Sequence, residues 1–437
     1  MSGHPARDRL IQISLGLYAV FSLTAMAGMN LSFLFVALTF FYVLMRSSFK
    51  GPVALSGFTE FKLYLEFGGA LFAACLLSLV VAKLSPIVYA GHAPDITVHG
   101  FFKIWYLLCP GILAVVFLSA SRPIEIIKQV RRAWWIATIA LSGVALVQFF
   151  TGWPLAQPIP TNPGRYHAIL FFGHHLSTSS ILIFPTFVAL AHAIGKQVRT
   201  RTVDRFAWAT GLAGLLILFL SYARAAWLSV PIGIMLLFFR YLSRRVGFIA
   251  ILALAIILAL SSQLSLVKER VENTMGITDR LRLWQANIDF FKHNPVTGIG
   301  WLKTQEMSEF YFKQNFPDHY HEYFWGHAHN NFFEMLGGTG LVGVAAFMAW
   351  SGFTFWLAFR TSRPEVFAFA PDAMIETRAE LNDLAYGLGV ALVLLHINGL
   401  TNVTFWEGKV MHQQMFAVGL LLTVRALQKR DVAQDTI

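Results

Sequence analysis

The side chains best suited to chemistry are concentrated in one hydrophilic stretch, residues 263–336. Within it, His329 lies just before the predicted start of a helix, and the partial positive charge of a helix N-terminus disfavours a charged imidazolium. A neutral imidazole is the form that a general base requires. The same position also suits a histidine that only caps the helix, and His327 competes for the role of base. We therefore name His329 as the candidate base and His327 as a substrate-binding neighbour.

Three arginines accompany these histidines at the same predicted face of the molecule. Arg280 lies inside the hydrophilic stretch, whereas Arg224 and Arg165 lie beside apolar segments earlier in the chain. A guanidinium group can bind phosphate oxygens in a bidentate manner, which lysine does poorly. A lone arginine at a membrane face usually only contacts lipid headgroups, but three that converge with a neutral histidine indicate an anionic, lipid-linked substrate. We expect Arg224 and Arg280 to act in catalysis and substrate binding, and Arg165 to bind substrate.

A metal site is the alternative interpretation of the histidine-rich part of this stretch. His319, His321, His327 and His329 form two His-x-His pairs whose equivalent positions are eight residues apart. This spacing fits no compact zinc pattern, and the chain has neither an HExxH nor a CxxC motif. We therefore expect no metal and no other cofactor.

The local sequence predicts how Arg280 is held. Thr278 and Asp279 form a good helix start, and apolar residues then recur at positions 281, 284, 288 and 291, the period of one helix face. Asn294-Pro295 and a Gly298-x-Gly300 turn would end this helix. The pattern predicts a short amphipathic helix at the membrane interface, with Arg280 in its first turn.

The composition indicates what kind of scaffold must position these residues. The 437 residues are 56% hydrophobic and only 13% charged, with a mean hydropathy of +0.58. An average soluble domain is about a quarter charged. Apolar runs near 20 residues, long enough to cross about 30 Å of hydrocarbon, recur along the chain. The sequence therefore predicts an all-α polytopic membrane protein and excludes a soluble enzyme and a disordered chain.

Neither the charge nor the cysteines change this interpretation. The net charge of +11 does not indicate a nucleic-acid partner, because the basic residues lie between apolar runs rather than on one patch. Cys75 and Cys109 both fall inside predicted spans, where we expect inert apolar side chains rather than a disulfide or a metal framework.

We predict about twelve membrane-spanning helices. The apolar run 206–239 is interrupted by Ser221, Tyr222 and Arg224, and an arginine in mid-membrane would cost about 2.5–3.5 kcal/mol. Dividing this run into two helices with a tight turn places Arg224 at a membrane face instead. The predicted spans are 10–27, 29–45, 63–84, 101–120, 133–151, 174–195, 206–221, 225–239, 246–262, 337–359, 385–403 and 410–426.

The basic residues predict the orientation of these spans. Alternate loops carry 22 of the 34 lysines and arginines, and the positive-inside rule places such loops in the cytoplasm. Both termini are therefore expected in the cytoplasm and the 263–336 loop outside. Ala25-x-Ala27 resembles a signal-peptide cleavage site, but a second apolar run follows at once, so we expect an uncleaved first span. The predicted organisation is nine helices in residues 1–262, a catalytic loop in 263–336 and three helices in 337–437.

Three stretches of this sequence resemble the O-antigen ligase and polymerase superfamily of bacterial envelope glycan transferases. The alanines after Arg224 depart mildly from the small glycine-like pattern of many members. The matching motifs lie within residues 160–345, and the order of the spans and the large loop is similar over the whole chain. The three stretches are Leu220-Ser-Tyr-Ala-Arg-Ala-Ala-Trp227, the helix from Arg280 through Trp284 to Pro295-Val-Thr-Gly-Ile-Gly300, and His329-Asn330 followed by Gly337-Gly-Thr-Gly-Leu341.

The resemblance implies glycosyl transfer at the periplasmic face of a bacterial inner membrane. The donor would be O-antigen on undecaprenyl pyrophosphate, and the acceptor a sugar hydroxyl of the lipid A core, both among membrane lipids. Arg224 and Arg280 match the family's essential arginines, His329 matches its essential histidine, and Arg165 is a softer match. Direct displacement would invert the anomeric centre. Because a prenyl pyrophosphate is already activated, neither ATP nor a divalent ion is required.

Other functions stay open at the level of sequence. A polymerase of the same superfamily would differ in its acceptor, and a protein-glycosylating ligase would use a serine or threonine hydroxyl. A transporter of lipid-linked glycans would need ionisable residues along a midplane pathway, for which Glu66 and His396 are the few candidates. Rod-shape and division glycan polymerases also have a large outer loop, but with a carboxylate-dependent site.

Overall fold

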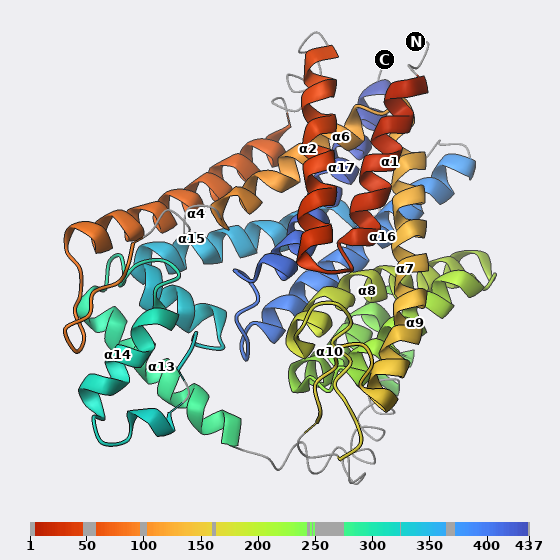
Figure 1. The fold of residues 1–437 in the computed structure, drawn as a ribbon. Coiled ribbons are helices and arrows are strands. Elements are labelled where there is room, and N and C mark those ends of the chain that lie inside the picture. Colours follow the sequence, from red (N-terminus) through yellow and green to blue (C-terminus); the bar gives the residue numbers. More distant parts are fainter. Residues whose placement is uncertain are drawn as a thin grey trace.

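The chain folds almost wholly into helices in the computed structural model (Figure 1). The structure describes residues 5–46, 58–96, 103–159, 163–242, 245–246, 248–249, 275–323, 325–363 and 372–435. Within these ranges there are 13 α-helices, two short 3₁₀-helices and two isolated β-bridges. The predicted all-α class is therefore confirmed for the described residues.

Eight described helices are long and apolar enough to cross a membrane, so the chain is a multi-pass membrane protein. Two shorter apolar segments accompany them, α9 (Arg205–Leu220) and the 3₁₀-helix η1 (Lys103–Leu108), which continues into α6 (Cys109–Leu118); α1 (Pro5–Phe21) opens the chain. The predicted span 246–262 lies almost entirely outside the described residues, so the count of twelve stays a prediction. The eight helices are α2 (Met26–Arg46), α4 (Thr59–Leu84), α7 (Pro123–Thr151), α8 (His175–Thr200), α10 (Arg224–Tyr241), α15 (Asn331–Thr361), α16 (Asp372–Asn398) and α17 (Gly408–Asp435).

The helix ends that carry the basic loops meet at one end of the bundle. Arg131 near the start of α7 pairs with Glu380 of α16 at 3.3 Å, and Arg425 near the end of α17 pairs with Glu60 at the start of α4 at 3.1 Å. Figure 1 marks both chain ends on this side of the molecule. The loops that the charge pattern assigned to one side of the membrane thus come together in space, although which side faces the cytoplasm stays a prediction.

Two helices, α8 and α17, form the buried centre of the bundle, since their apolar windows are buried throughout. A helix that is apolar all round is stable only inside other helices. Small residues of the neighbours allow close approach: a Cβ on Gly211 or Gly214 of α9 would lie 2.5 Å or less from a side chain of α8, and one on Gly387 of α16 would lie 2.7 Å from the α8 backbone.

The predicted division of the apolar run 206–239 is confirmed. α9 ends at Leu220, α10 begins at Arg224, and Tyr222 between them has a left-handed backbone, with φ 59°. The segment before α8 packs on this turn, because Ala168 N–H donates to the Leu220 carbonyl at 3.0 Å. Arg224 is therefore fixed at the N-terminus of a spanning helix.

The hydrophilic stretch forms α13 (Met275–His293), α14 (Thr304–Asn315) and the 3₁₀-helix η2 (Tyr320–Glu322), coloured green to teal in Figure 1. These elements have a small hydrophobic core of their own around Phe290 and Tyr311. Tyr89, from the segment after α4, joins that core, and Ala90 N–H donates to Gln314 at 2.7 Å. The stretch is thus packed against the membrane helices as well as connected to them by the chain.

The prediction for α13 was wrong in its start. The helix is described from Met275, so Arg280 lies in its second turn rather than its first, because residues 275–277 continue the helix past the Thr278–Asp279 signal. Its fully buried positions are 283, 286, 287 and 290, whereas Leu281 of the predicted face is 54% exposed. Packing against α14 and α15 selects the buried face. The helix ends at His293, before Asn294-Pro295, as predicted.

The helix α15 contains a break at Gly340, which has φ 61° and ψ −160°. The loop Pro295–Gly300 inserts at this break, and two of its amides donate to the carbonyls of Gly337 and Gly338, at 3.0 Å each. A Cβ on Gly298 would lie 2.4 Å from the backbone of Gly338. Only glycines permit this contact, and it fixes the end of α13 against the beginning of α15.

Candidate functional site

The segment Gly326–Asn330, which carries both candidate histidines, is held from several sides. Ala328 N–H donates to the Glu334 carboxylate at 2.7 Å, and the Trp284 indole N–H donates to the Ala328 carbonyl at 2.8 Å. The Trp284 ring also stacks on Phe333, with centroids 4.9 Å apart. Trp284 lies four residues after Arg280 and therefore on the same side of α13. One tryptophan thus links the helix that carries Arg280 to the segment that carries His329.

The start of α15 directly follows His329, as predicted. The Asn330 side chain accepts hydrogen bonds from two amides of the first turn, at 2.8 and 3.1 Å, which is an N-cap. Asn331 N–H donates to the Gly399 carbonyl at 2.7 Å, and its side chain bonds Thr404 at 2.9 Å. These contacts hold His329 in a left-handed conformation, with φ 49°, which is costly for a residue other than glycine.

The surroundings of His329 keep its imidazole neutral. Its pKa is lowered to about 3, and burial is the largest cause. Electrostatic coupling to His327, Arg280 and His174 lowers the pKa further. A hydrogen bond with the Asn402 side chain acts in the opposite direction. The sequence predicted a neutral histidine from the helix N-terminus, whereas the structure adds burial and cationic neighbours as the causes.

The neighbouring His327 differs from His329 in which ring nitrogen can accept a proton. Its Nδ1 accepts the backbone N–H of His329 at 3.2 Å. Burial, with Arg280 and Lys103, lowers the pKa of His327 to about 4, so this ring is neutral as well. In a neutral imidazole with Nδ1 as acceptor, the proton resides on Nε2. His327 is therefore set to donate a hydrogen bond from Nε2 rather than to take up a proton there.

Arg280 lies near a second arginine, Arg224. Burial lowers the pKa of its guanidinium, and the nearby Arg224 lowers it further. Among the described residues no carboxylate counteracts this shift. The structure thus brings Arg280, Arg224 and the two histidines together, and an arginine in such a position favours the binding of an anion.

Arg165 has a different environment from the other predicted residues. Its guanidinium lies over the ring of Phe150, 4.9 Å from the centroid, and donates to the Gly164 carbonyl at 3.0 Å. Its neighbour His167 contacts the turn before Arg224, with Nδ1 3.1 Å from the Ser221 carbonyl oxygen. None of these contacts joins Arg165 to Arg280 or His329, so its substrate-binding role stays a prediction.

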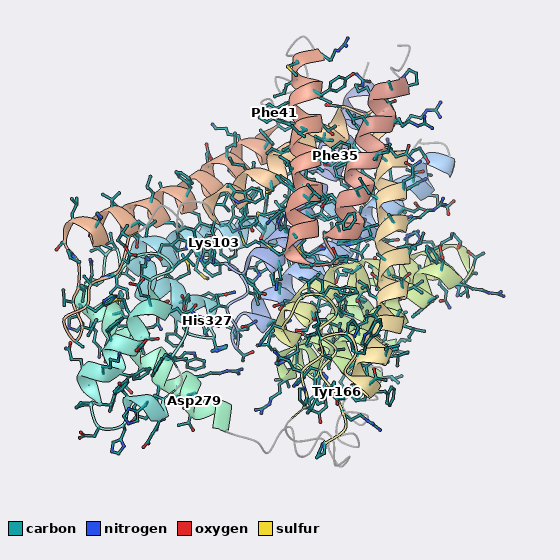
Figure 2. All side chains as sticks on the ribbon, viewed as in Figure 1. Phe35, Phe41, Lys103, Tyr166, Asp279 and His327 are labelled. Carbon is teal, nitrogen blue, oxygen red and sulfur yellow. The ribbon has the colours of Figure 1, made fainter. Side chains whose placement is uncertain are left out.

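A cavity of about 420 Å³ opens beside the histidines. One wall comes from the segments around α14 and the start of α15, and the other from η1, the start of α8 and the segment before α17. Lys103 and His327, labelled in Figure 2, belong to opposite walls. The residues that line the cavity are Lys103, His174, Ser177, Leu302, Gln305, Trp325, Gly326, His327, His329, Glu334, Asn402, Val403, Trp406 and Glu407.

The second wall carries ionisable groups of both signs, Lys103 and Glu407. Burial raises the pKa of Glu407, and the hydroxyl of Ser177, which donates to this carboxylate, lowers it. Burial lowers the pKa of Lys103, while the negative potential of Glu334 and Glu407 raises it. The one lysine of the cavity therefore faces two carboxylates.

Sequence analysis missed this second wall. Lys103 fell inside the predicted span 101–120, and a lysine inside an apolar run is a functional signal in itself. In the structure Lys103 belongs to η1, and the α-helix of this region begins only at Cys109, so the lysine is not inside a long span. Ser177 and Glu407 carried no comparable signal, because only the folded chain brings residues so distant in sequence together.

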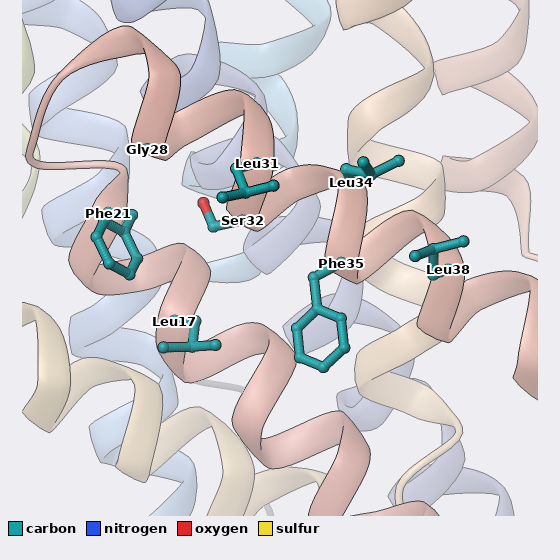
Figure 3. A pocket seen from close by; sticks show the side chains of 8 residues that line it. All are labelled: Leu17, Phe21, Gly28, Leu31, Ser32, Leu34, Phe35 and Leu38. Carbon is teal, nitrogen blue, oxygen red and sulfur yellow. The ribbon is translucent and has the colours of Figure 1, made fainter.

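A second cavity, of about 300 Å³, lies between α1 and α2 and has a different character (Figure 3). Its only polar side chain is Ser32, whose hydroxyl already donates to the Met29 carbonyl at 3.0 Å. It contains no titratable group, so it offers a surface for hydrocarbon rather than a site of chemistry. Its lining residues are Leu17, Phe21, Gly28, Leu31, Ser32, Leu34, Phe35 and Leu38.

The histidines considered as metal ligands do not gather. His319 contacts Glu322 of η2 at 3.3 Å, and the ring of His321 lies against Tyr320. Neither lines the cavity of His327 and His329. Within the described part of the chain, no three of His, Cys, Asp and Glu are arranged to hold a metal ion.

Comparison with known proteins gives a family match to the middle of the chain. Residues 209–348 match the O-antigen ligase family, a segment that includes Arg224, Arg280, His327 and His329. No curated protein matches the sequence. Proteins of this family belong to a superfamily of membrane ligases and polymerases that transfer glycans. The match over residues 209–348 thus supports assignment of this chain to the O-antigen ligase family.

Proposed function

We propose that this protein transfers O-antigen from undecaprenyl pyrophosphate to a sugar hydroxyl of the lipid A core, at the periplasmic face of the inner membrane. The observation that carries the proposal is a neutral, buried His329 that lines a polar cavity and is coupled electrostatically to Arg280, which in turn lies near Arg224. An anionic leaving group needs positive charge beside it, and a base must be neutral to accept a proton. The reaction therefore needs the arginines and the neutral histidine side by side.

Arg280 and Arg224 would hold the pyrophosphate of the donor. The guanidinium groups of Arg280 and Arg224 repel each other, and an anion bound between them relieves this repulsion. Relief of the repulsion therefore contributes to the affinity for the donor. As the bond from the anomeric carbon to the pyrophosphate oxygen breaks, negative charge develops on that oxygen. Planar guanidinium groups stabilise this charge in a poorly hydrated site. Arg165 would contact the donor from the neighbouring loop.

His329 would act as the general base. The acceptor hydroxyl oxygen bonds to the anomeric carbon, His329 takes the hydroxyl proton, and the prenyl pyrophosphate leaves with the electron pair of the broken bond. His327, whose Nε2 carries a proton, would instead donate a hydrogen bond to the donor. The displacement occurs in one step on the face opposite the leaving group, so it inverts the anomeric configuration.

The low pKa of His329 suits this role only once the donor is bound. A base with a pKa of about 3 is weak, because burial disfavours the imidazolium and the charge of Arg280 disfavours it further. A pyrophosphate bound by the arginines neutralises that repulsion and raises the pKa of His329. Proton transfer thus becomes favourable when the donor is in place, which protects the site from unproductive chemistry.

The proposal is tested by reconstituting the purified protein with prenyl-pyrophosphate-linked glycan and lipid A core, in EDTA and without ATP. Transfer to lipid A core with inversion of the anomeric centre is the expected result. Lengthening of the glycan on its prenyl carrier would assign the protein to the polymerases instead. If the glycan were neither transferred nor lengthened, the proposed function would be wrong.

A further inference from the structure

We propose that the cavity beside His329 is the binding site for the terminal sugar of the acceptor, and that this sugar is uncharged. The inference rests on the proposed function and specifies where its second substrate binds. Glu407, Ser177 and Lys103 would form hydrogen bonds with the sugar, and Trp325 would pack against its ring.

The position of His329 separates the two substrates. In a displacement with inversion, the attacking hydroxyl and the leaving group lie on opposite sides of the anomeric carbon, and the base lies with the hydroxyl. The electrostatic neighbours of Arg280 are Arg224 and the histidines, and no arginine lines the cavity. The arginines therefore mark the side of the leaving pyrophosphate, and the cavity is on the side from which the acceptor attacks.

The lining of the cavity has the chemistry of a sugar-binding site. Carboxylate, hydroxyl and amide groups are supplied by Glu407, Ser177, Asn402 and Gln305. The Trp325 ring is 40% exposed, and its indole N–H is already bonded to the Tyr320 carbonyl at 2.9 Å, which fixes the ring. An exposed indole face packs well on the apolar face of a pyranose. The volume of about 420 Å³ is within the range of small-ligand pockets.

The charges of the lining favour a neutral sugar. Among the described residues that line the cavity, Lys103 is the only lysine or arginine, and it faces Glu334 and Glu407. Both histidines of the segment 326–330 are neutral. A phosphate or an acidic sugar placed here would meet two carboxylates for one ammonium group. A sugar hydroxyl, by contrast, can donate to Glu407 and accept from Lys103.

The origin of the two walls agrees with a role in acceptor choice. His327, His329 and Trp325 lie within residues 209–348, which match the family, whereas Lys103, Ser177 and Glu407 lie outside that segment. The groups assigned to the reaction itself therefore come from the matched segment. The groups assigned to the acceptor come mostly from the rest of the chain.

The test compares Glu407→Gln and Trp325→Ala with matched controls. Glu309→Gln alters a carboxylate of α14 that pairs with Lys313, outside the cavity, and Trp356→Ala removes a ring of similar exposure, 43%, on α15. For Glu407→Gln and Trp325→Ala we expect KM for the lipid A core to rise about tenfold or more, since each loses a direct contact. The KM for the donor and the kcat should change little, and the controls should match the wild type. An unchanged KM for the lipid A core in both variants would overturn the assignment of this cavity to the acceptor sugar.

A binding measurement separates this inference from the proposed function. The delipidated, dephosphorylated core oligosaccharide is titrated into the purified protein, with no donor present. Binding that Glu407→Gln and Trp325→Ala weaken would support the sugar site even if no transfer were found. Transfer combined with undiminished binding to both variants would support the function and contradict the site. A gain of tenfold or more for the phosphorylated oligosaccharide, removed by Lys103→Gln, would overturn the assignment to a neutral sugar.

Discussion

The two ends of this helix bundle use arginine in opposite ways. At the end that gathers the basic loops, Arg425 lies 3.1 Å from Glu60, and their side chains are only 6% and 7% exposed. Lys429 contacts the same carboxylate at 2.6 Å. At the other end, the charged neighbour of Arg280 is Arg224, which lowers the pKa of Arg280, and the neighbouring His327 and His329 are neutral.

This difference shows that the partner, rather than the residue type, decides what a buried arginine does. A paired arginine neutralises a carboxylate and joins two helices, so its charge is already satisfied in the folded protein. An arginine held beside other cations raises the free energy of the empty site, and an anionic ligand relieves it. The first arrangement therefore contributes to stability and the second to binding. The four predictions below test this contrast, from the largest expected effect to the smallest.

The largest effect is expected for His329→Ala at the cation-rich end. Loss of the general base should lower the transfer rate about 10²–10⁴-fold, while the folded protein and donor binding persist. The rate is measured by transfer of glycan to lipid A core. His321→Ala is the control, because this histidine lies on η2 outside the cavity. Normal transfer by His329→Ala would remove the assignment of the base.

The opposite result is expected for Glu60→Gln at the paired end. The change leaves the buried Arg425 without its carboxylate, so the free energy of unfolding should fall by about 3–5 kcal/mol. Transfer per folded molecule should stay at the wild-type level. On the same helix, Glu66→Gln removes an exposed pair with Lys62, whose side chains are 53% and 73% exposed, and should cost about 1 kcal/mol at most. Equal losses of stability in Glu60→Gln and Glu66→Gln would contradict the stabilising role assigned to the buried pair of Arg425 and Glu60.

Much of the scaffold could be predicted from local sequence. The interruption at Ser221–Arg224 marked a helix boundary because an arginine is costly inside hydrocarbon, and the structure has the boundary there. His329 was expected just before a helix start, and α15 begins two residues after it. The Asn294-Pro295 stop also ended α13 correctly. These features depend on neighbours within a few residues, so a single sequence contains the information.

Some features could not be predicted from the sequence, and each of them depends on contacts between residues that are far apart in the chain. The break of α15 at Gly340 exists because the loop Pro295–Gly300 inserts there, some 40 residues away in the chain. The buried face of α13 is selected by α14 and α15 rather than by its own apolar period. The second wall of the cavity brings together Lys103, Ser177 and Glu407, which no local pattern connects.

A smaller effect is expected for Arg280→Lys, which tests whether the cation-rich end needs planar guanidinium groups or only positive charge. Lysine keeps the charge but loses the bidentate geometry, so transfer should fall about tenfold or more, mainly through poorer stabilisation of the leaving pyrophosphate. Arg282→Lys on the same helix is the control, because Arg282 stacks on Tyr323 at 4.1 Å and lies outside the cavity. Wild-type kinetics for Arg280→Lys would indicate an arginine that only contacts lipid headgroups.

The smallest effect concerns pH and follows from the cations around His329. In the free protein its pKa of about 3 lies well below the ordinary value near 6.5, so the base is already neutral at pH 5 and stays so above it. The kcat/KM for the donor should therefore be nearly constant between about pH 5 and 8. With donor bound, the pyrophosphate raises the pKa of His329, so the fall of kcat at low pH should begin at a higher pH than the fall of kcat/KM. Coincident acid limbs for the two parameters would mean that the donor does not offset the positive potential at His329, and the arginines would then have to bind it elsewhere.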